Sequence, residues 1–278
     1  MSRIVSALCQ TPAVKNKEES LRHAGEYIRK AAGQGAKLVV LPEMFCCPYK
    51  TDAFPVYAEP AGGVMWQFLS EAARENAVIL AGGSIPELGE DGRLFNTCFV
   101  FDEEGKQIGR HRKMHLFDVD IPGGLRFKES DTLSAGNQVT VLGTPWGGLG
   151  VMICFDVRFP ELARLTALGG AGAIIVPAAF NMTTGPMHWE LLMKARAIDN
   201  FTYLLACAPA RDEGASYVSY ANSMVVSPWG EVIARLEADP GILYCELDME
   251  VVTSAREQIP VLRARRTDVY TLRADQPQ

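Results

Sequence analysis

The sequence lacks an excess of positive charge, and this excludes one broad class of partner. Its 27 Lys and Arg residues are outnumbered by 33 Asp and Glu residues, which leaves a net charge of −6. A mildly acidic chain has no electrostatic footprint for nucleic acid or for an anionic membrane. The one basic cluster comprises Arg263, Arg265 and Arg266, and such a short cluster is typical of a solvated or ion-paired tail. We therefore expect no nucleic-acid partner and no membrane partner.

The sequence also lacks a long apolar run and a paired cysteine motif. Its longest apolar run, residues 171–180, is broken by Gly172 and Pro177, whereas a membrane-spanning helix needs about 20 apolar residues. Residues 1–10 alternate apolar and polar side chains, which is not the continuous apolar core of a secretory signal. The seven cysteines are odd in number and form no Cys-x-x-Cys pair. These features predict a cytoplasmic protein.

What the chain has in quantity is apolar material arranged in alternating strands and helices. Hydrophobic residues make up 48% of its 278 positions, which is ample for a buried core. A helix capped by Asn16, with Glu19 completing a capping box, is expected to end near Gly33 or Gly35. Further helices are expected at 65–76, 160–168 and 189–200, and strands at 4–9, 38–41, 78–81, 96–101, 106–113, 149–153, 173–176, 202–208, 224–226, 232–236 and 242–247. This alternation predicts one α/β layered domain over residues 1–278, with a C-terminal tail from about residue 260.

Three chemically active side chains stand where predicted strands end. Glu43 follows the strand at 38–41, Lys113 ends the strand at 106–113, and Cys154 follows the strand at 149–153. In α/β sheets, functional side chains gather at the carboxyl ends of strands. Each position taken alone is weak evidence, because a lone cysteine after an apolar strand usually serves packing and a lone Glu or Lys at a strand end is usually a solvated loop charge.

Cys154 differs from the other six cysteines in its local setting. It lies between an apolar strand and a predicted helix at 160–168, which is the strand-to-helix elbow that exposes a nucleophile. The helix start is expected to lower the thiol pKa. Four of the other cysteines lie inside apolar strands and two, Cys46 and Cys47, lie in the loop after Glu43.

Three motifs in this order resemble the nitrilase superfamily of carbon–nitrogen hydrolases. They are Leu41-Pro42-Glu43, the stretch 112–116 around Lys113, and the elbow around Cys154. The resemblance runs from about residue 5 to residue 270, and within the superfamily it is strongest to the omega-amidases, through residues 82–87, 115–123, 181–190, 209–212 and 215–217. One departure is Phe155, where many relatives carry tyrosine.

The resemblance implies a four-layer α-β-β-α sandwich of the nitrilase type and a Glu43–Lys113–Cys154 triad. Cys154 would form a thioester, Glu43 would transfer protons, and Lys113 with the Phe155 backbone N–H would hold the oxyanion. Glu129 matches a supporting glutamate that would position Lys113, although a surface loop charge is the alternative interpretation. The resemblance implies no metal and no cofactor, and a homodimer or higher homo-oligomer. Residues 154–168 and the C-terminal tail are the candidate contact.

The omega-amidase resemblance implies a small ω-amide of a dicarboxylate as substrate, such as 2-oxoglutaramate or 2-oxosuccinamate. Such a substrate carries a carboxylate remote from its amide. Thr183 and Thr184, with the backbone N–H groups freed by Gly185, are candidates for binding that anion. The alternative is that the two threonines cap the following helix.

Other functions stay open at this stage. Within the family, the alternatives are an amidase for deaminated glutathione or, less favoured by the sequence, a nitrile or carbamoyl hydrolase. An inactive scaffold of the same fold would have no need for all three triad residues. A papain-like Cys–His hydrolase would depend on His188, which follows Cys154 in no suggestive setting. His111 and His115 have a four-residue spacing but no further ligands for a metal.

Overall fold

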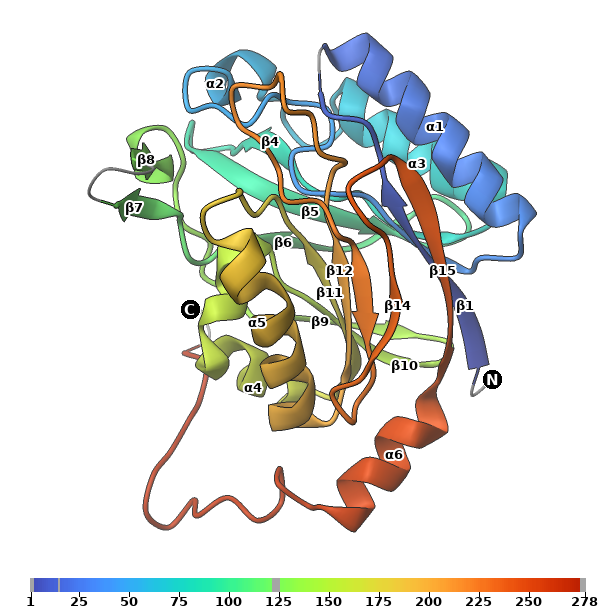
Figure 1. Cartoon of the computed structure of the whole chain (residues 1–278), viewed down its shortest axis with the longest axis vertical. Helices are drawn as coiled ribbons and strands as arrows, with labels where there is room; N and C mark the ends of the chain where they lie inside the picture. Colours follow the sequence, from blue (N-terminus) through green and yellow to red (C-terminus); the bar gives the residue numbers. More distant parts are fainter. Residues whose placement is uncertain (1–2, 15, 122–125, 276–278) are drawn as a thin grey trace.

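Two β-sheets lie face to face, and helices cover the outer face of each (Figure 1). The computed structural model describes residues 3–14, 16–121 and 126–275. Pro122 and Gly123, the end of one stretch that carries the family resemblance, lie outside the described residues, as do both ends of the chain. The arrangement confirms the predicted α-β-β-α sandwich.

The first sheet has seven strands, all from the N-terminal half of the chain except β15. Its order is β15 (Gly241–Asp248), β1 (Arg3–Gln10), β2 (Leu38–Val40), β3 (Ile79–Ala81), β5 (Leu94–Phe101) and β4 (Ile85–Leu88), with β6 (Gln107–Arg112) also paired to β5. β1, β2 and β3 are parallel, so their carboxyl ends lie at one edge of the sheet. That edge is where Glu43 emerges.

The second sheet has six strands from the C-terminal half. Its order is β14 (Val232–Arg235), β13 (Met224–Val226), β12 (Tyr203–Cys207), β11 (Ala171–Pro177), β10 (Gly147–Val151) and β9 (Thr140–Thr144). β10, β11 and β12 are parallel. A small separate ribbon is formed by β7 (Asp118–Asp120) and β8 (Arg126–Lys128).

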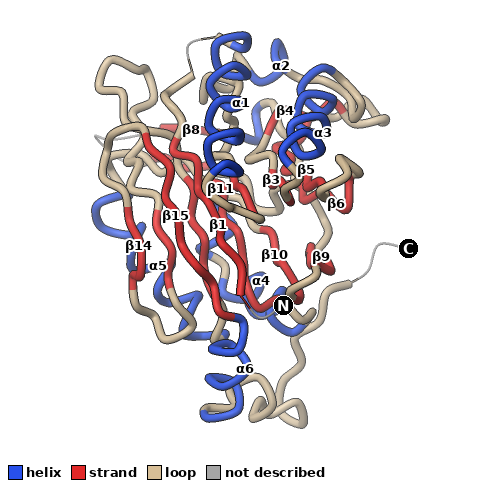
Figure 2. The backbone as a smooth tube through the Cα atoms, turned by 90° about the vertical axis from the view of Figure 1, so that its right-hand side faces the viewer, coloured by secondary structure: helices blue, strands red, loops and turns tan. Residues whose placement is uncertain are grey.

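Strand alternation decides which side chains fill each layer. Along β1, Ile4 and Leu8 pack between the two sheets, whereas Ala7 and Cys9 face the helices, because successive strand residues point to opposite faces. α1 (Lys17–Gly33) and α3 (Val64–Asn76) cover the first sheet, and α4 (Pro160–Leu168) and α5 (Gly185–Asn200) cover the second (Figures 1 and 2). No helix in the described ranges is long and apolar enough to cross a membrane.

The predicted helices and strands are present, and α1 begins as expected. The Asn16 side chain accepts a hydrogen bond from the Glu19 backbone N–H at 2.9 Å. α5 begins at Gly185, four residues before the predicted start at Trp189, because Pro186 is compatible with the first helical turn.

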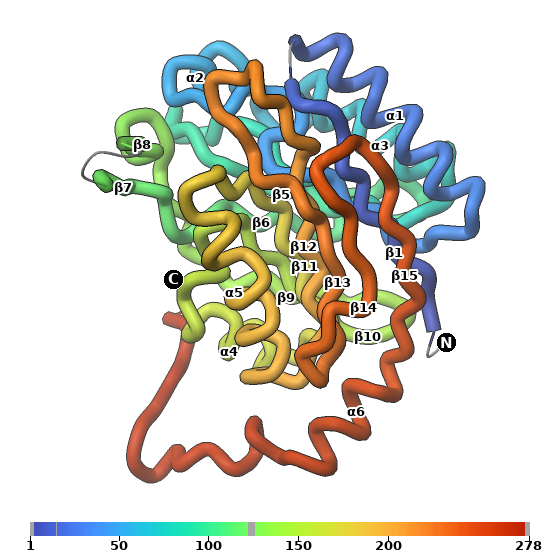
Figure 3. The backbone as a smooth tube through the Cα atoms, viewed as in Figure 1, coloured from blue at the N-terminus to red at the C-terminus, as the bar shows by residue number. Residues whose placement is uncertain are grey.

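The short elements were not predicted: β4, β7, β8, β9, α2 (Phe54–Tyr57) and α6 (Met249–Gln258). β4 contains Pro86, which disfavours a strand interior and fits an edge strand. α6 and the tail after it leave the sandwich, and the tail returns towards α4 (Figure 3).

Candidate active site

Glu43, Lys113 and Cys154 are brought together although they are far apart in the sequence. They follow β2, β6 and β10 by a few residues and are only 2%, 0% and 6% exposed. Lys113 Nζ lies 2.9 Å from Glu43 Oε1. The Cys154 thiol lies close enough to the Glu43 carboxylate for each to shift the pKa of the other. The three predicted residues therefore share one buried site.

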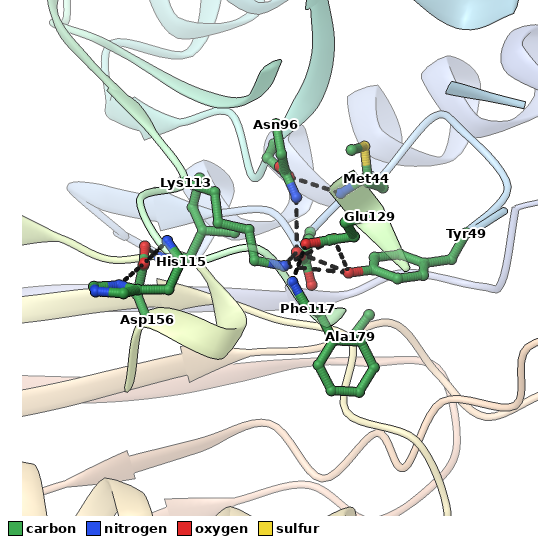
Figure 4. A network of polar contacts seen from close by, with 12 residues as sticks. Met44, Tyr49, Asn96, Lys113, His115, Phe117, Glu129, Asp156 and Ala179 are labelled. Carbon is green, nitrogen blue, oxygen red and sulfur yellow. Dashed lines mark hydrogen bonds and ion pairs between the residues drawn. The ribbon is translucent and has the colours of Figure 1, made fainter. Parts of the chain in front are cut away.

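Lys113 donates to a second buried carboxylate, which the sequence analysis identified as supporting. Its Nζ lies 2.9 Å from Glu129 Oε1, and Glu129 Oε2 accepts the Phe117 backbone N–H at 2.7 Å (Figure 4). Glu129 is fully buried, so the alternative of a surface loop charge is wrong. The backbone contact fixes the carboxylate, and the carboxylate in turn fixes the ammonium.

Tyr49 and Asn96 complete the network, and neither was singled out from the sequence. The Tyr49 hydroxyl lies 2.7 Å from Glu129 Oε1 and 3.2 Å from Glu43 Oε1, and Asn96 Nδ2 donates to Glu43 Oε1 at 2.8 Å (Figure 4). Tyr49 lies in an irregular loop and Asn96 inside β5. The spacing of apolar and polar residues does not single out either position, because the side chains that Tyr49 and Asn96 contact belong to other segments of the chain.

The backbone at Cys154 has a left-handed conformation, with φ of 46°. A non-glycine residue in this region is strained and is held by its surroundings. The Asp156 side chain stabilises this conformation, because its Oδ2 accepts a hydrogen bond from the Ile153 backbone N–H at 3.0 Å. The strand-to-elbow prediction is confirmed, but the elbow turns first into a short 3-10 helix (Cys154–Arg158) and only then into α4. Phe155 follows Cys154 directly and lines the same pocket.

Asp156 also ties the elbow to the segment that carries Lys113. Its carboxylate accepts the ring N–H of His111 at 3.0 Å, the ring N–H of His115 at 2.8 Å and the His115 backbone N–H at 2.9 Å. Burial acts against the Asp156 carboxylate, but the hydrogen bonds from the two histidines outweigh it and lower its pKa. Within the described ranges, no group of three or more His, Cys, Asp or Glu side chains is placed to hold a metal ion.

The expectation that the pKa of the Cys154 thiol is lowered is wrong. Burial, followed by the neighbouring Glu43 carboxylate, raises the pKa of Cys154 well above its ordinary value, and the Lys113 charge offsets this only in part. Burial and the charge of Glu129 also raise the pKa of Glu43 against the opposing effect of Lys113. The Cys154 thiol is therefore neutral at physiological pH, and it lies beside a carboxyl group that is more basic than usual.

Burial opposes the charged form of Lys113, but the Glu129 and Glu43 carboxylates outweigh burial and raise the pKa of Lys113 well above its ordinary value. The ammonium therefore stays charged through the physiological range. This makes it a permanent local cation beside the thiol, able to stabilise negative charge that develops there.

Two small pockets reach the site from different sides. One, of about 70 Å³, is lined by Glu43 and Tyr49, and the other, of about 10 Å³, is lined by Cys154 and Arg158. Ligand sites for drug-sized molecules have about 300 Å³ or more, so these pockets suit a small substrate.

The pocket that contains Cys154 also contains two buried donors without partners. Asn181 Oδ1 accepts the backbone N–H groups of Thr183 and Thr184 at 2.9 and 3.0 Å, which fixes the orientation of the amide. Its Nδ2, like Arg158 Nε, makes no hydrogen bond of normal geometry in the described part of the chain, although the Asn181 amide lies close enough to the Tyr217 hydroxyl to act against the rise in its pKa. Buried donors of this kind are rare and call for a partner.

The predicted anion site at Thr183 and Thr184 is not formed as expected. Their backbone N–H groups are taken by Asn181. Thr183 is exposed and, in the described ranges, lines neither pocket, whereas Thr184 lines the pocket of Cys154. Capping of α5 by a threonine side chain is not seen either: Thr184 occupies the N-cap position, but its side chain makes no capping bond within the described residues.

The buried Glu–Lys–Cys group at strand ends of a four-layer sandwich defines a class, and the comparisons with known proteins agree. Residues 6–257 match the carbon–nitrogen hydrolase family, and the chain belongs to that family. It is a hydrolase that acts on amides.

Within the family the chain is most like the omega-amidases. It is 48% identical to omega-amidase NIT2-A of Xenopus laevis, over 98% of both chains. The crystal structure of Nit3 from Saccharomyces cerevisiae superposes with a TM-score of 0.88 at 43% identity, over 95% of this chain and 97% of that chain. A mutant of a Nesterenkonia amidase, with 25% identity over 96% of this chain and 95% of that chain and a TM-score of 0.76, carries the acetamide moiety of fluoroacetamide covalently added at its active-site cysteine.

Proposed function

We propose that this protein is an omega-amidase that releases ammonia from small ω-amides of dicarboxylates, such as 2-oxoglutaramate and 2-oxosuccinamate. The observation that carries the proposal is the shared pocket of Cys154, Arg158 and Asn181. It places a nucleophile beside two donors that lack partners among the described residues. An ω-amide presents the matching pair of groups, a carbonyl carbon for the thiol and a carboxylate for the donors.

The first half of the reaction makes a thioester. The Cys154 sulfur bonds to the amide carbon while Glu43 accepts the thiol proton. Negative charge develops on the carbonyl oxygen, which the Lys113 ammonium and the Phe155 backbone N–H stabilise. The carbon–nitrogen bond then breaks, and Glu43 returns its proton to the departing ammonia. Glu129 holds Lys113 in place through the 2.9 Å contact and orients the amide NH₂.

The second half of the reaction hydrolyses the thioester. Glu43 takes a proton from a water molecule as the water oxygen bonds to the carbonyl carbon. The carbon–sulfur bond breaks, the free acid leaves, and the proton returns to the Cys154 sulfur. The raised pKa of Glu43 suits this role, because the same group must accept and release a proton in each half. The acetamide moiety of fluoroacetamide that is bound to the active-site cysteine of a Nesterenkonia amidase variant supports the role of the corresponding thiol as nucleophile.

Arg158 and Asn181 are our candidates for binding the remote carboxylate, with Thr184 beside them. The Arg158 guanidinium is half-buried, and burial lowers its pKa while the thiolate form of Cys154 would raise it. It lies over the rings of Phe155 and Phe180 at 5.5 and 5.2 Å, which holds the planar group in one orientation. A carboxylate would pair with the guanidinium and with the free Asn181 amide.

The test compares matched substrates. Ammonia release is measured with 2-oxoglutaramate and 2-oxosuccinamate, with their methyl esters, and with deaminated glutathione as the rival substrate. Arg158→Met should weaken kcat/KM for the free acids about 10- to 150-fold, since charged hydrogen bonds are worth about 1.5–3 kcal/mol, and should affect the esters much less. Thr183→Val, outside the pocket, is the control. Equal losses on acids and esters, or a clear preference for deaminated glutathione, would refute the proposal.

We also propose a homodimer or higher homo-oligomer in the cytoplasm. α5 exposes Met187, Leu191 and Ile198, with 62%, 66% and 47% of their surface accessible, which is unusual for a free helix face. A hollow between α4 and the C-terminal tail lies beside it. All seven cysteines, each among the described residues, are free thiols, as expected in a reducing compartment. Light scattering that finds only monomers at micromolar concentration would refute the dimer.

A further inference from the structure

The two pockets of the site meet at one aromatic side chain. Tyr217 and Ala179 line both the pocket that contains Glu43 and the pocket that contains Cys154. We propose that Tyr217 is the residue that sets how long an amide the enzyme accepts. This inference rests on the proposed function for its substrates, and it concerns a residue outside the catalytic group.

The Tyr217 ring is held firmly in its position. Its hydroxyl donates to the Ala179 carbonyl at 2.6 Å, and its ring packs on Tyr49 at a centroid distance of 4.6 Å and on Phe127 at 5.8 Å. Buried aromatic contacts of this kind restrict a side chain to one rotamer. The ring therefore acts as a wall between the pockets.

The backbone that carries Tyr217 is anchored on the same strand end. The Tyr220 N–H donates to the Phe180 carbonyl at 2.6 Å, and Ser219 forms an isolated β-bridge with Asn181. These contacts attach residues 217–220 to the segment after β11, which also carries Ala179. The position of the ring is thus set relative to Cys154 and does not depend on the outer part of the loop.

The Tyr217 side chain lies close to both the nucleophile and the base, because it lines the pocket of Cys154 as well as the pocket of Glu43. Burial raises the pKa of Tyr217 well above its ordinary value, and the charges of Cys154 and Glu43 add to this effect. The Ala179 backbone, to which the hydroxyl donates, also lowers the pKa of Cys154 by hydrogen bonding to its sulfur. A substrate chain that starts at Cys154 therefore meets this wall within a short distance.

The consequence is a limit on chain length. The pocket of Cys154 alone has a volume of about 10 Å³, whereas the neighbouring pocket adds about 70 Å³ that the ring closes off. Removing the ring would join the two pockets and admit additional methylene groups. One methylene changes kcat/KM about 10–200-fold in a fitted pocket, so the effect on selectivity is large enough to measure.

The experiment uses the full chain and two series of substrates. The first series is the monoamides of malonic, succinic, glutaric and adipic acid, and the second is the uncharged amides from propionamide to hexanamide. The readout is the ratio of kcat/KM for the longest to that for the best short amide, which a general loss of activity does not change. The variants are Tyr217→Ala and Tyr217→Phe, with Tyr244→Ala on β15 as the control for loss of an aromatic ring elsewhere.

Tyr217→Ala should raise this ratio at least 10-fold in both series. Tyr217→Phe keeps the ring and loses the bond to Ala179, so it should lower kcat/KM for every amide and leave the ratio within about threefold. An unchanged ratio in Tyr217→Ala would overturn the inference. If that variant does not fold, Tyr217→Leu is judged by the same ratio.

The two series separate this inference from the proposed function. If the wild-type enzyme prefers uncharged amides, the omega-amidase proposal fails, and the chain-length ratio is still read in the second series. If the wild type prefers the acids but Tyr217→Ala keeps the same ratio, the proposed function stands and Tyr217 is only structural.

Discussion

Replacing Lys113 by Met would test whether the buried charge network both catalyses and stabilises. Lys113 is fully buried and contacts Glu43 Oε1 and Glu129 Oε1, each at 2.9 Å. Lys113→Met keeps much of the volume but leaves two carboxylates facing each other without a cation. Breaking a buried ion pair in this way costs about 3–5 kcal/mol, and loss of an oxyanion donor lowers turnover about 10²–10³-fold.

The loss of stability in Lys113→Met should depend on pH, and the direction of that dependence follows from the pKa of the buried carboxyl group. Without the cation, the folded-state pKa of Glu43 should rise further above its ordinary value, because the opposing effect of Lys113 is lost, so the folded protein binds more protons than the unfolded chain. Such a group favours the folded state below its unfolded pKa of about 4.3 and loses this contribution as pH rises through the folded pKa. The destabilisation of Lys113→Met should therefore be largest near neutral pH and shrink towards acid pH.

The assay is thermal unfolding at several pH values together with ammonia release. At neutral pH the variant should melt on the order of 10 °C below the wild type, from the slope typical of chains this size. Adding Glu129→Gln removes one of the two facing charges, so the double variant should regain much of the stability and none of the activity. A single variant as stable as the wild type at every pH would refute the reasoning.

Four further results are expected. Cys154→Ala should fold and release no ammonia, and Cys154→Ser should be nearly as inactive; near-wild-type turnover in either would rule out the nucleophile. Glu43→Gln should lose about 10²–10⁴ in turnover, and Glu129→Ala should lose less, so equal losses would contradict the division between base and supporting residue. Because the proton acceptor must be ionised, kcat/KM should fall as pH drops through the raised pKa of Glu43, and a flat acid limb would count against it. Asp156→Asn should lower kcat more than KM changes, because it loosens the elbow; the opposite split in steady-state kinetics would refute that role.

Part of this site was predictable because each reactive side chain follows closely on a strand that the sequence reveals. The apolar strands β2 and β10 end shortly before Glu43 and Cys154, and functional side chains gather at the carboxyl ends of strands. The two strands belong to different sheets, so the packing of the sheets, and not one sheet edge, brings these ends together. The α/β layered class follows from helices interposed between strands, whereas the four-layer order was implied by the family resemblance. The strand positions and the layered class depend on periodicity and chain order, which the sequence contains directly.

The tertiary structure alone decided which groups touch the reactive side chains. Tyr49 comes from an irregular loop and Asn96 from the middle of β5, and both reach Glu43 only because the two segments fold against it. The pKa of the Cys154 thiol depends on burial and on the neighbouring carboxylate, neither of which is visible in the elbow motif.

At the substrate end of the site, too, the sequence predicted the segment, and the tertiary structure decided which of its groups can bind a ligand. The motif at residues 181–185 indicated polar contacts, and the sequence favoured the two threonine positions as donors. In the folded chain, Asn181 turns back to accept their N–H groups, so its own amide becomes the free donor, and Arg158 reaches the same pocket from the nucleophile elbow. Hydrogen bonds between neighbours compete with those to a ligand, and only the three-dimensional arrangement decides which groups remain free.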